Sequence, residues 1–152
     1  MGKRIFETDL LRETNMIGRL NHVGVATPSI EKSMALYRDV LGATKIHDRF
    51  KMEEQGVYVC FVDVPNSQIE LIEPIDDKSP IAGFLKNNPE GGQHHICFEV
   101  DDLYAARDDM VAKGARVLGE PRIGAHGTEI IFVHPKDMGG VLVELMQKPD
   151  SQ

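Results

Sequence analysis

Two stretches of the chain repeat one pattern of apolar and polar positions. Each opens with a short run, at residues 22–26 and 95–99, in which apolar residues alternate with polar or small ones. Such alternation is typical of a strand with one buried face. Seven residues after the first histidine of each run stands a possible helix N-cap, Ser29 or Asp102, and apolar residues at helical spacing follow. In the first predicted helix these apolar residues are Ile30, Met34, Tyr37 and Leu41.

Each predicted helix is followed by three strand-like runs. Gly42 and Gly114 mark the helix ends, where glycine commonly adopts the left-handed conformation. The runs are 44–50, 57–64 and 67–73 in the first half, and 116–120, 129–133 and 140–147 in the second. The pattern predicts an α+β fold, in which two tandem βαβββ modules form a curved sheet around a cleft and the helices lie outside.

The repeat also sets the expected domain boundaries. These are 1–18 for an N-terminal arm or helix, 19–148 for a single domain, and 19–75 and 93–148 for its two modules. The sequence pattern predicts a linker helix at residues 79–88, between the two modules. Ser79 is its expected cap, and Pro80 occupies the first helical position, where proline is favoured.

Strand parity places four ionisable side chains on the cleft face. The large apolar residues of each first strand should pack under its helix, which turns His22 and His95 to the opposite side and selects His95 over His94. Those apolar residues are Val23, Val25, Ile96 and Phe98. Glu70 and Glu144, 48 and 49 residues after the two histidines, each stand between apolar neighbours and should face the cleft too.

Two imidazoles and two carboxylates in one cleft are costly to desolvate unless a cation joins them. With both histidines neutral, the two negative charges of the glutamates balance the charge of one divalent metal ion per chain. Mixed nitrogen and oxygen ligands suit Mn, Fe, Co, Ni or Zn. A single strand histidine is more often a hydrogen-bonded core residue, and a single glutamate usually faces solvent. Recurrence at equivalent places in two repeats favours the metal site.

The remaining histidines carry weaker expectations. His47 should lie on the surface, and His94 could support a ligand from behind. His126 belongs to a Gly-rich loop that could close over a ligand, and His134 precedes a proline in a turn.

Composition narrows the class of protein. The 152 residues are 41% hydrophobic, which is enough for a core, and no apolar run approaches the ~18 residues of a membrane span. A net charge of −7 without a basic block disfavours nucleic acid and anionic membranes as partners. Cys60 and Cys97 lie in apolar runs and form no disulfide framework, which favours a reducing compartment, the cytoplasm, and Cys97 is expected to be a buried thiol on the cleft face. No secretory apolar region opens the chain.

Several motifs resemble a known superfamily, the vicinal oxygen chelate or glyoxalase superfamily, and within it the methylmalonyl-CoA epimerase family. The matching stretches are 21–26, 70–74, 79–85, 91–96, 123–127 and 134–145, and the resemblance covers residues 20–148. It implies that the metal ligands are His22, Glu70, His95 and Glu144. It also implies a homodimer and cobalt as the first choice of metal, with Mn, Ni, Zn or Fe as alternatives.

The resemblance implies inversion at C2 of methylmalonyl-CoA. The C2 proton lies between a thioester and a carboxylate, and a metal would stabilise the enolate formed by its removal. Glu144 and Glu70 are the candidate acid–base pair. The sequence departs from some epimerases, which have a glutamate where Val59 stands here and Gln in place of Glu70. Candidate contacts to the acyl-CoA are His126, Gly127, Lys136, Arg122 and Lys51.

Three other functions share this superfamily. A lactoylglutathione lyase can use the same ligand set, but its Asp-Pro-Asp-Gly-aromatic segment differs from residues 134–138 here. An extradiol dioxygenase needs open positions on iron beside two histidines and one carboxylate, and Glu70 would fill one of them. A non-catalytic small-molecule-binding protein needs no set of four ionisable ligands.

Overall fold

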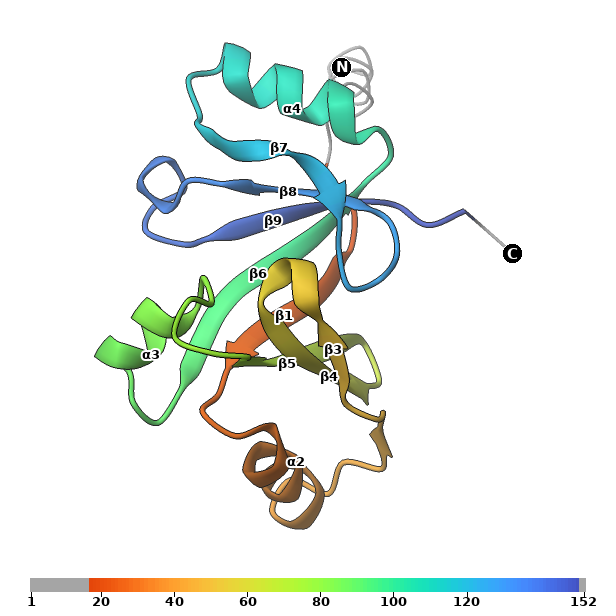
Figure 1. The fold of residues 1–152 in the computed structure, drawn as a ribbon. Coiled ribbons are helices and arrows are strands. Elements are labelled where there is room, and N and C mark those ends of the chain that lie inside the picture. The colour runs from red at the N-terminus through yellow and green to blue at the C-terminus, as the bar shows by residue number, and fades with distance from the viewer. Residues whose placement is uncertain (1–16, 151–152) are drawn as a thin grey trace. The chain divides into compact units, whose positions relative to one another are not determined.

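The computed structural model describes residues 17–150, which form two compact units (Figure 1). The first unit is residues 20–97, and the second is residues 17–19 with 98–150. Most of the predicted N-terminal arm, residues 1–16, lies outside the described residues. Residues 17–19 belong to the second unit, where Gly18 donates its backbone N–H to the carbonyl of Glu99 over 2.6 Å.

The first unit contains one long helix and a mixed sheet. Its elements are β1 (Leu20–Ala26), α2 (Ile30–Asp39), β2 (Lys45–Ile46), β3 (Phe50–Met52), the 3-10 helix η1 (Glu53–Gln55), β4 (Val57–Val64), β5 (Ser67–Pro74), α3 (Ala82–Asn87) and the start of β6 (Gly92–Val100). Four strands follow the order β2-β4-β5-β1, and β3 also pairs with β4. The β1–β5 pair is parallel and the β4 pairs are antiparallel.

Two side chains satisfy the first backbone donors of α2, which contacts β4 and β5. Ser29 Oγ accepts from the Lys32 N–H over 3.2 Å, as predicted, and the Glu73 carboxylate accepts from the Ile30 N–H over 2.8 Å. The apolar face of α2 packs on strand residues that include Cys60 and Leu71. From the helix it contributes Ile30, Met34 and Tyr37. Leu41 was expected on this face but is 73% exposed, because α2 ends at Asp39.

Two short segments differ from the sequence expectation. The predicted strand at 44–50 is two short strands, because the register against β4 shifts by one residue between the Ile46–Val62 and Phe50–Val59 pairs. The linker helix begins at Ala82 rather than at Pro80. Ser79 instead closes a turn, in which its carbonyl accepts from the Ala82 N–H over 3.0 Å.

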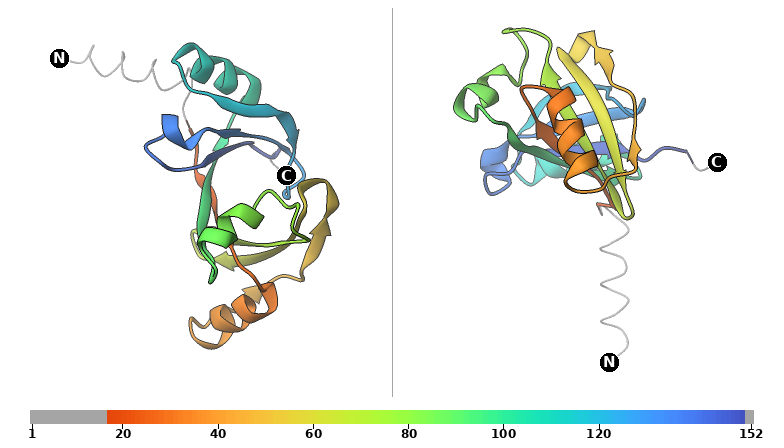
Figure 2. Two further views of the ribbon diagram at one scale, coloured as in Figure 1. Left: turned by 60° about the vertical axis from the view of Figure 1, so that its left-hand side comes forward. Right: turned by 90° about the horizontal axis from the view of Figure 1, so that it is seen from below.

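The second unit repeats the plan of the first (Figure 2). Its elements after β6 are α4 (Leu103–Ala112), β7 (Val117–Ile123), β8 (Glu129–Val133), the 3-10 helix η2 (Pro135–Asp137) and β9 (Val143–Gln147). Strands β7, β8 and β9 form an antiparallel sheet with β8 in the middle, and α4 contacts all three.

The repeat extends to individual hydrogen bonds at the helix starts. The Asp102 side chain accepts from the N–H of Ala105, three residues further along, over 3.0 Å. The Ser29 side chain accepts from the N–H of Lys32 with the same spacing in the first unit. Gln147 accepts from the Leu103 N–H over 2.9 Å, in the place that Glu73 takes in the first unit. The predicted α+β fold of two βαβββ modules is therefore confirmed. No helix in residues 17–150 is long and apolar enough to cross a membrane.

Candidate metal centre

His22 and Glu70 lie on one face of the first unit's sheet because of how β1 pairs with β5. Gly24 is the register partner of Glu70, and Val25 that of Leu71. Val25 and Leu71 belong to the apolar cluster under α2. Since side chains alternate along a strand, His22 and Glu70 point to the other face. His22 is fully buried there and Glu70 is 6% exposed.

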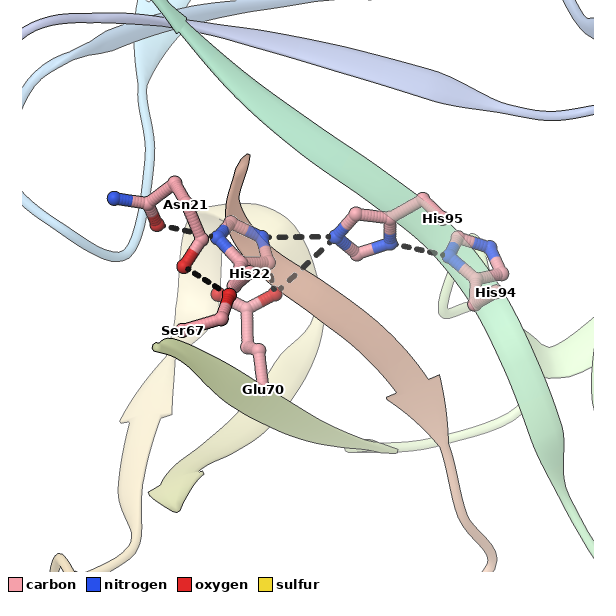
Figure 3. A network of polar contacts seen from close by, with 6 residues as sticks. All are labelled: Asn21, His22, Ser67, Glu70, His94 and His95. Atoms are coloured by element: carbon pink, nitrogen blue, oxygen red, sulfur yellow. Dashed lines mark hydrogen bonds and ion pairs between the residues drawn. The ribbon is translucent and has the colours of Figure 1, made fainter. Parts of the chain in front are cut away.

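His95 on β6 completes a convergent group of three donor atoms within the first unit (Figure 3). The Nε2 atoms of His22 and His95 are 3.2 Å apart. The Glu70 Oε1 atom lies 3.6 Å from Nε2 of His22 and 3.4 Å from Nε2 of His95. The structure thus brings together three of the four ligands that the sequence predicted, and His95 rather than His94 is the one that points at Glu70.

The imidazole of His95 lies directly against the backbone of Gly24. A Cβ atom added at Gly24 would be 2.0 Å from Cε1 of His95 and 2.5 Å from its Nε2. Real Cβ contacts are never this short, so any side chain at this position would displace the ring. Glycine at position 24 of β1, opposite Glu70 on β5, is therefore needed for the His95 ring to reach its position.

The second ring nitrogen of each histidine contacts the residue that precedes it in the chain. Asn21 Oδ1 lies 2.7 Å from Nδ1 of His22, and Nδ1 of His94 lies 2.8 Å from Nδ1 of His95. Ser67 holds the backbone at this point by donating its hydroxyl to the Asn21 carbonyl over 3.2 Å. The sequence analysis considered His94 but missed Asn21. Asn21 directly precedes His22, as His94 directly precedes His95. This equivalent position in the two repeats was the signal that could have identified Asn21.

The three donor atoms fit a divalent metal ion. Tetrahedral ligands about 2.0–2.1 Å from a metal are about 3.3 Å from one another, close to the separations observed here. Two imidazole nitrogens and a carboxylate oxygen are also the ligand types that first-row transition metals accept. The buried carboxylate supplies negative charge to balance part of the cation's charge.

Glu144 occupies in the second unit the position that Glu70 occupies in the first. In the antiparallel register, Glu70 on β5 pairs with Phe61 on β4, and Glu144 on β9 pairs with Phe132 on β8. Glu144 is 5% exposed and stands between buried strand residues, as its flanking apolar neighbours predicted.

Val59 faces the same side of the sheet as Glu70. Val59 pairs with Ile72, which is two residues beyond Glu70 on β5 and so points to the same face. The Val59 side chain is buried and has no ionisable group. Together with Phe61, these residues make the surface beside Glu70 apolar.

The predicted substrate contacts are divided between the two units. Lys51 lies on β3 of the first unit, where its Nζ is 3.2 Å from a carboxylate oxygen of Glu53. Arg122 on β7 donates to the carbonyls of Leu118 and Glu120, over 3.4 and 3.2 Å. His126 and Gly127 lie in the loop between β7 and β8, where Gly127 has a φ of +84°.

Lys136 lies in η2, which is held by an ion pair. The Arg116 guanidinium donates to both carboxylate oxygens of Asp137, over 2.8 and 3.2 Å. These hydrogen bonds lower the pKa of Asp137 to about 2. The imidazole of His134 accepts from the Lys136 N–H over 3.0 Å. These hydrogen bonds fix the backbone on both sides of Lys136.

The other singled-out residues take structural roles within their units. His47 is exposed, as expected, and lies 2.8 Å from the Asp63 carboxylate. Cys60 and Cys97 are buried and form no disulfide, and burial raises the pKa of the Cys60 thiol. Cys97 was expected to be buried.

Comparison with known proteins places the chain in a family. Residues 21–132 match the Glyoxalase/Bleomycin resistance protein/Dioxygenase superfamily. Over 134 residues the chain is 54% identical to an ethylmalonyl-CoA/methylmalonyl-CoA epimerase of Cereibacter sphaeroides, a match that covers 87% of this chain and 99% of that protein. The chain belongs to the methylmalonyl-CoA epimerase family. The family resemblance noted in the sequence is thereby confirmed.

Solved structures of the epimerase family have the same fold. A methylmalonyl-CoA epimerase from Mycobacterium tuberculosis superposes with a TM-score of 0.81 at 33% identity, covering 90% of this chain and 92% of that one. An epimerase from Streptomyces coelicolor in complex with 2-nitronate-propionyl-CoA gives a TM-score of 0.80 at 35% identity, covering 88% and 99%. A probable lactoylglutathione lyase of Vibrio cholerae is less similar, at 31% identity over 130 residues, 85% of this chain and 90% of that protein.

Proposed function

We propose that this chain is a metal-dependent epimerase that inverts C2 of methylmalonyl-CoA. One observation carries the proposal: the buried group of His22, Glu70 and His95, with donor atoms 3.2 to 3.6 Å apart, occurs in a member of the methylmalonyl-CoA epimerase family. The 54% identity to an epimerase over almost its entire length favours this activity over that of the less similar lactoylglutathione lyase.

The proposed metal ligands are His22, Glu70, His95 and Glu144. Glu144 is included because it takes the place of Glu70 in the second repeat, with the same pairing to a phenylalanine on the neighbouring strand. Cobalt is the first choice of metal, and Mn, Ni, Zn and Fe are compatible with this ligand set. A divalent metal in this position supplies a Lewis acid that stabilises negative charge on the oxygen of an enolised thioester.

The proton transfers are assigned to Glu144 and Glu70. Inversion requires that a proton leave one face of C2 and that another be delivered to the opposite face, which a single fixed carboxylate cannot do. Val59 offers no base on the sheet face that holds Glu70. Glu70 is therefore the candidate partner of Glu144 in the first unit. The apolar side chains of Val59 and Phe61 beside it strengthen electrostatic interactions by excluding water.

Binding of the acyl-CoA is assigned to exposed cations and to one loop. Lys136 and Lys51 present ammonium groups on defined elements, whereas Arg122 already donates to carbonyls of its own strand. His126 and Gly127 lie in a turn-rich loop that could contact the acyl group.

A homodimer in the cytoplasm completes the proposal. Three apolar side chains at the end of α2 and just beyond it are exposed by 60 to 74%, and exposed apolar groups of this kind favour an interface between copies. They are Leu36, Val40 and Leu41. Two buried cysteines that form no disulfide suit a reducing compartment.

Proton exchange at C2 tests the activity. Metal-loaded protein in D2O should remove the C2 proton signal of methylmalonyl-CoA in NMR spectra, and His22→Ala should abolish this exchange. His47→Ala is the matched control, because His47 is exposed and pairs with Asp63. Turnover of the methylglyoxal–glutathione hemithioacetal without exchange at C2 would contradict the proposal and assign the protein as a lyase.

A further inference from the structure

Beside Glu70, the sheet face of the first unit changes from polar to apolar. On one side, on β1, lies His22, whose Nε2 is 3.6 Å from Oε1 of Glu70. On the other side, on β4, the register partner of Glu70 is Phe61. Register partners on adjacent antiparallel strands share a face, and their Cβ atoms are about 4.5–5.5 Å apart. The Phe61 side chain is therefore a direct neighbour of the Glu70 side chain.

The apolar surface continues from β4 onto β3. Phe50 is the register partner of Val59, so it faces the same side of the sheet as Val59 and Phe61. The rings of Phe50 and Phe61 are in contact, with centroids 5.7 Å apart and an angle of 52° between their planes. Phe50 is 38% exposed, whereas Val59 and Ile72 are buried. Apolar side chains thus extend from the neighbour of Glu70 to an exposed ring on β3.

The opposite face of β4 packs under α2. Tyr58 and Cys60, which alternate with Val59 and Phe61 along the strand, belong to the apolar cluster on which α2 lies. Phe61 points away from that cluster and is only partly buried. The packing of α2 therefore explains the aromatic ring of Tyr58, but not the two adjacent rings on the face that holds Glu70.

The proposed reaction brings C2 of the substrate to the boundary between polar and apolar groups. A base must come within hydrogen-bonding reach of the proton that it removes, which places C2 beside the Glu70 carboxylate. C2 carries the thioester carbon, the carboxylate carbon and one alkyl group. The oxygen atoms suit the side of His22 and His95, where polar groups converge. The alkyl group suits the side of Phe61, because contact with the ring removes apolar surface from water.

We propose that Phe61 receives the alkyl group at C2 and limits its size. This inference rests on the proposed function and names its substrate class, CoA thioesters of malonic acids with a short alkyl group at C2. Phe50 packs against the Phe61 ring, and Val59 occupies the next position of β4 on the same face. The ring therefore has little room to turn away from a longer chain. Phe61 determines specificity and takes no part in proton transfer.

The preference between two alkyl groups tests this assignment. The measured quantity is the ratio of kcat/KM for ethylmalonyl-CoA to kcat/KM for methylmalonyl-CoA, from C2 proton exchange in D2O. Phe61→Ala opens space beside Glu70 and should raise the ratio by about 10-fold or more, the scale of one methylene group in an apolar pocket. Phe61→Leu should raise it less, and it decides the question if the alanine variant does not fold. An unchanged or lower ratio would overturn the proposal.

Tyr58→Leu is the matched control, because Tyr58 lies on the same strand with its ring on the α2 face. Lys51 Nζ is 6.0 Å from the centre of the Tyr58 ring, but the two thioesters share the CoA tail, so a disturbance of Lys51 would affect both equally. The ratio should stay that of the unaltered chain, and a rise equal to that in Phe61→Ala would contradict the proposal.

Calorimetric titration with the same two thioesters compares their affinities independently of the exchange rate. In Phe61→Ala, the affinity for ethylmalonyl-CoA should rise relative to that for methylmalonyl-CoA, and an unchanged relative affinity would count against the role of Phe61. If the unaltered, metal-loaded chain exchanged C2 protons with neither thioester, the proposed function itself would be refuted.

Discussion

At the scale of single residues, the absence of one side chain matters as much as the presence of the ligands. Gly24 leaves the space that the ring of His95 occupies beside Glu70. The sequence predicted the ligands through strand parity, because a period of two is visible in the pattern itself. It did not indicate that the ring of His95 lies against Gly24, since that contact joins residues 71 positions apart in the chain.

A methyl group at Gly24 should disturb the centre more than the fold. Gly24→Ala is expected to displace the imidazole of His95, to cost about 1–3 kcal/mol of stability through overpacking, and to weaken Zn²⁺ binding by about 10-fold or more. Gly83→Ala is the matched control, because Gly83 lies in α3 with no heavy atom within 4 Å of the added carbon. Calorimetry and chelator competition measure both effects. Unaltered zinc affinity in Gly24→Ala would contradict the steric account.

At the scale of secondary-structure elements, local signals in the sequence predicted most boundaries. The N-caps Ser29 and Asp102 begin helices as expected, and the glycines after both helices have positive φ. The break between β2 and β3 was not predictable, because it comes from a one-residue register shift against β4. The additional caps at the helix starts were missed as well, because they come from the ends of distant strands.

These distant caps give a prediction about stability. Glu73→Ala removes the acceptor of the Ile30 N–H and should lower the free energy of unfolding by about 0.5–2 kcal/mol. Glu73→Gln should be much milder, because Gln147 holds the same place in the second unit. Urea denaturation measures both, with Glu31→Gln on the exposed first turn of α2 as a control. An equal loss in Glu73→Gln and Glu73→Ala would show that the carboxylate charge, rather than the acceptor, stabilises the helix.

At the scale of the whole molecule, each of the two repeats has a buried carboxylate at the equivalent strand position. Glu70 and Glu144 occupy the same position in their respective units, and the register partner of each is a phenylalanine on the adjacent strand. This equivalence was predictable from the sequence, because both the spacing and the flanking residues recur. The supporting role of Asn21 was not, since an asparagine before a strand carries no distinctive pattern of its own.

The equivalence predicts opposite stereochemical defects. Glu144→Gln should keep C2 proton exchange with one epimer of methylmalonyl-CoA and lose it with the other, and Glu70→Gln should show the reverse preference. Both should lose epimerisation by roughly 10²-fold or more, the scale of a general base. Glutamine keeps an oxygen for the metal, so metal content serves as the internal control. Near-normal epimerisation by metal-loaded Glu70→Gln would assign Glu70 as a ligand only, and Glu53, Glu54 or a water would then be the second base.

The most direct test of the central claim measures metal content and C2 exchange on the same sample. Protein loaded with cobalt should contain about one metal ion per chain, the stoichiometry expected of two neutral histidines and two carboxylates around one divalent ion. Chelation should abolish exchange at C2 of methylmalonyl-CoA while the circular dichroism spectrum is kept, and restoring the metal should restore the exchange. Full exchange activity in metal-free protein would contradict the account.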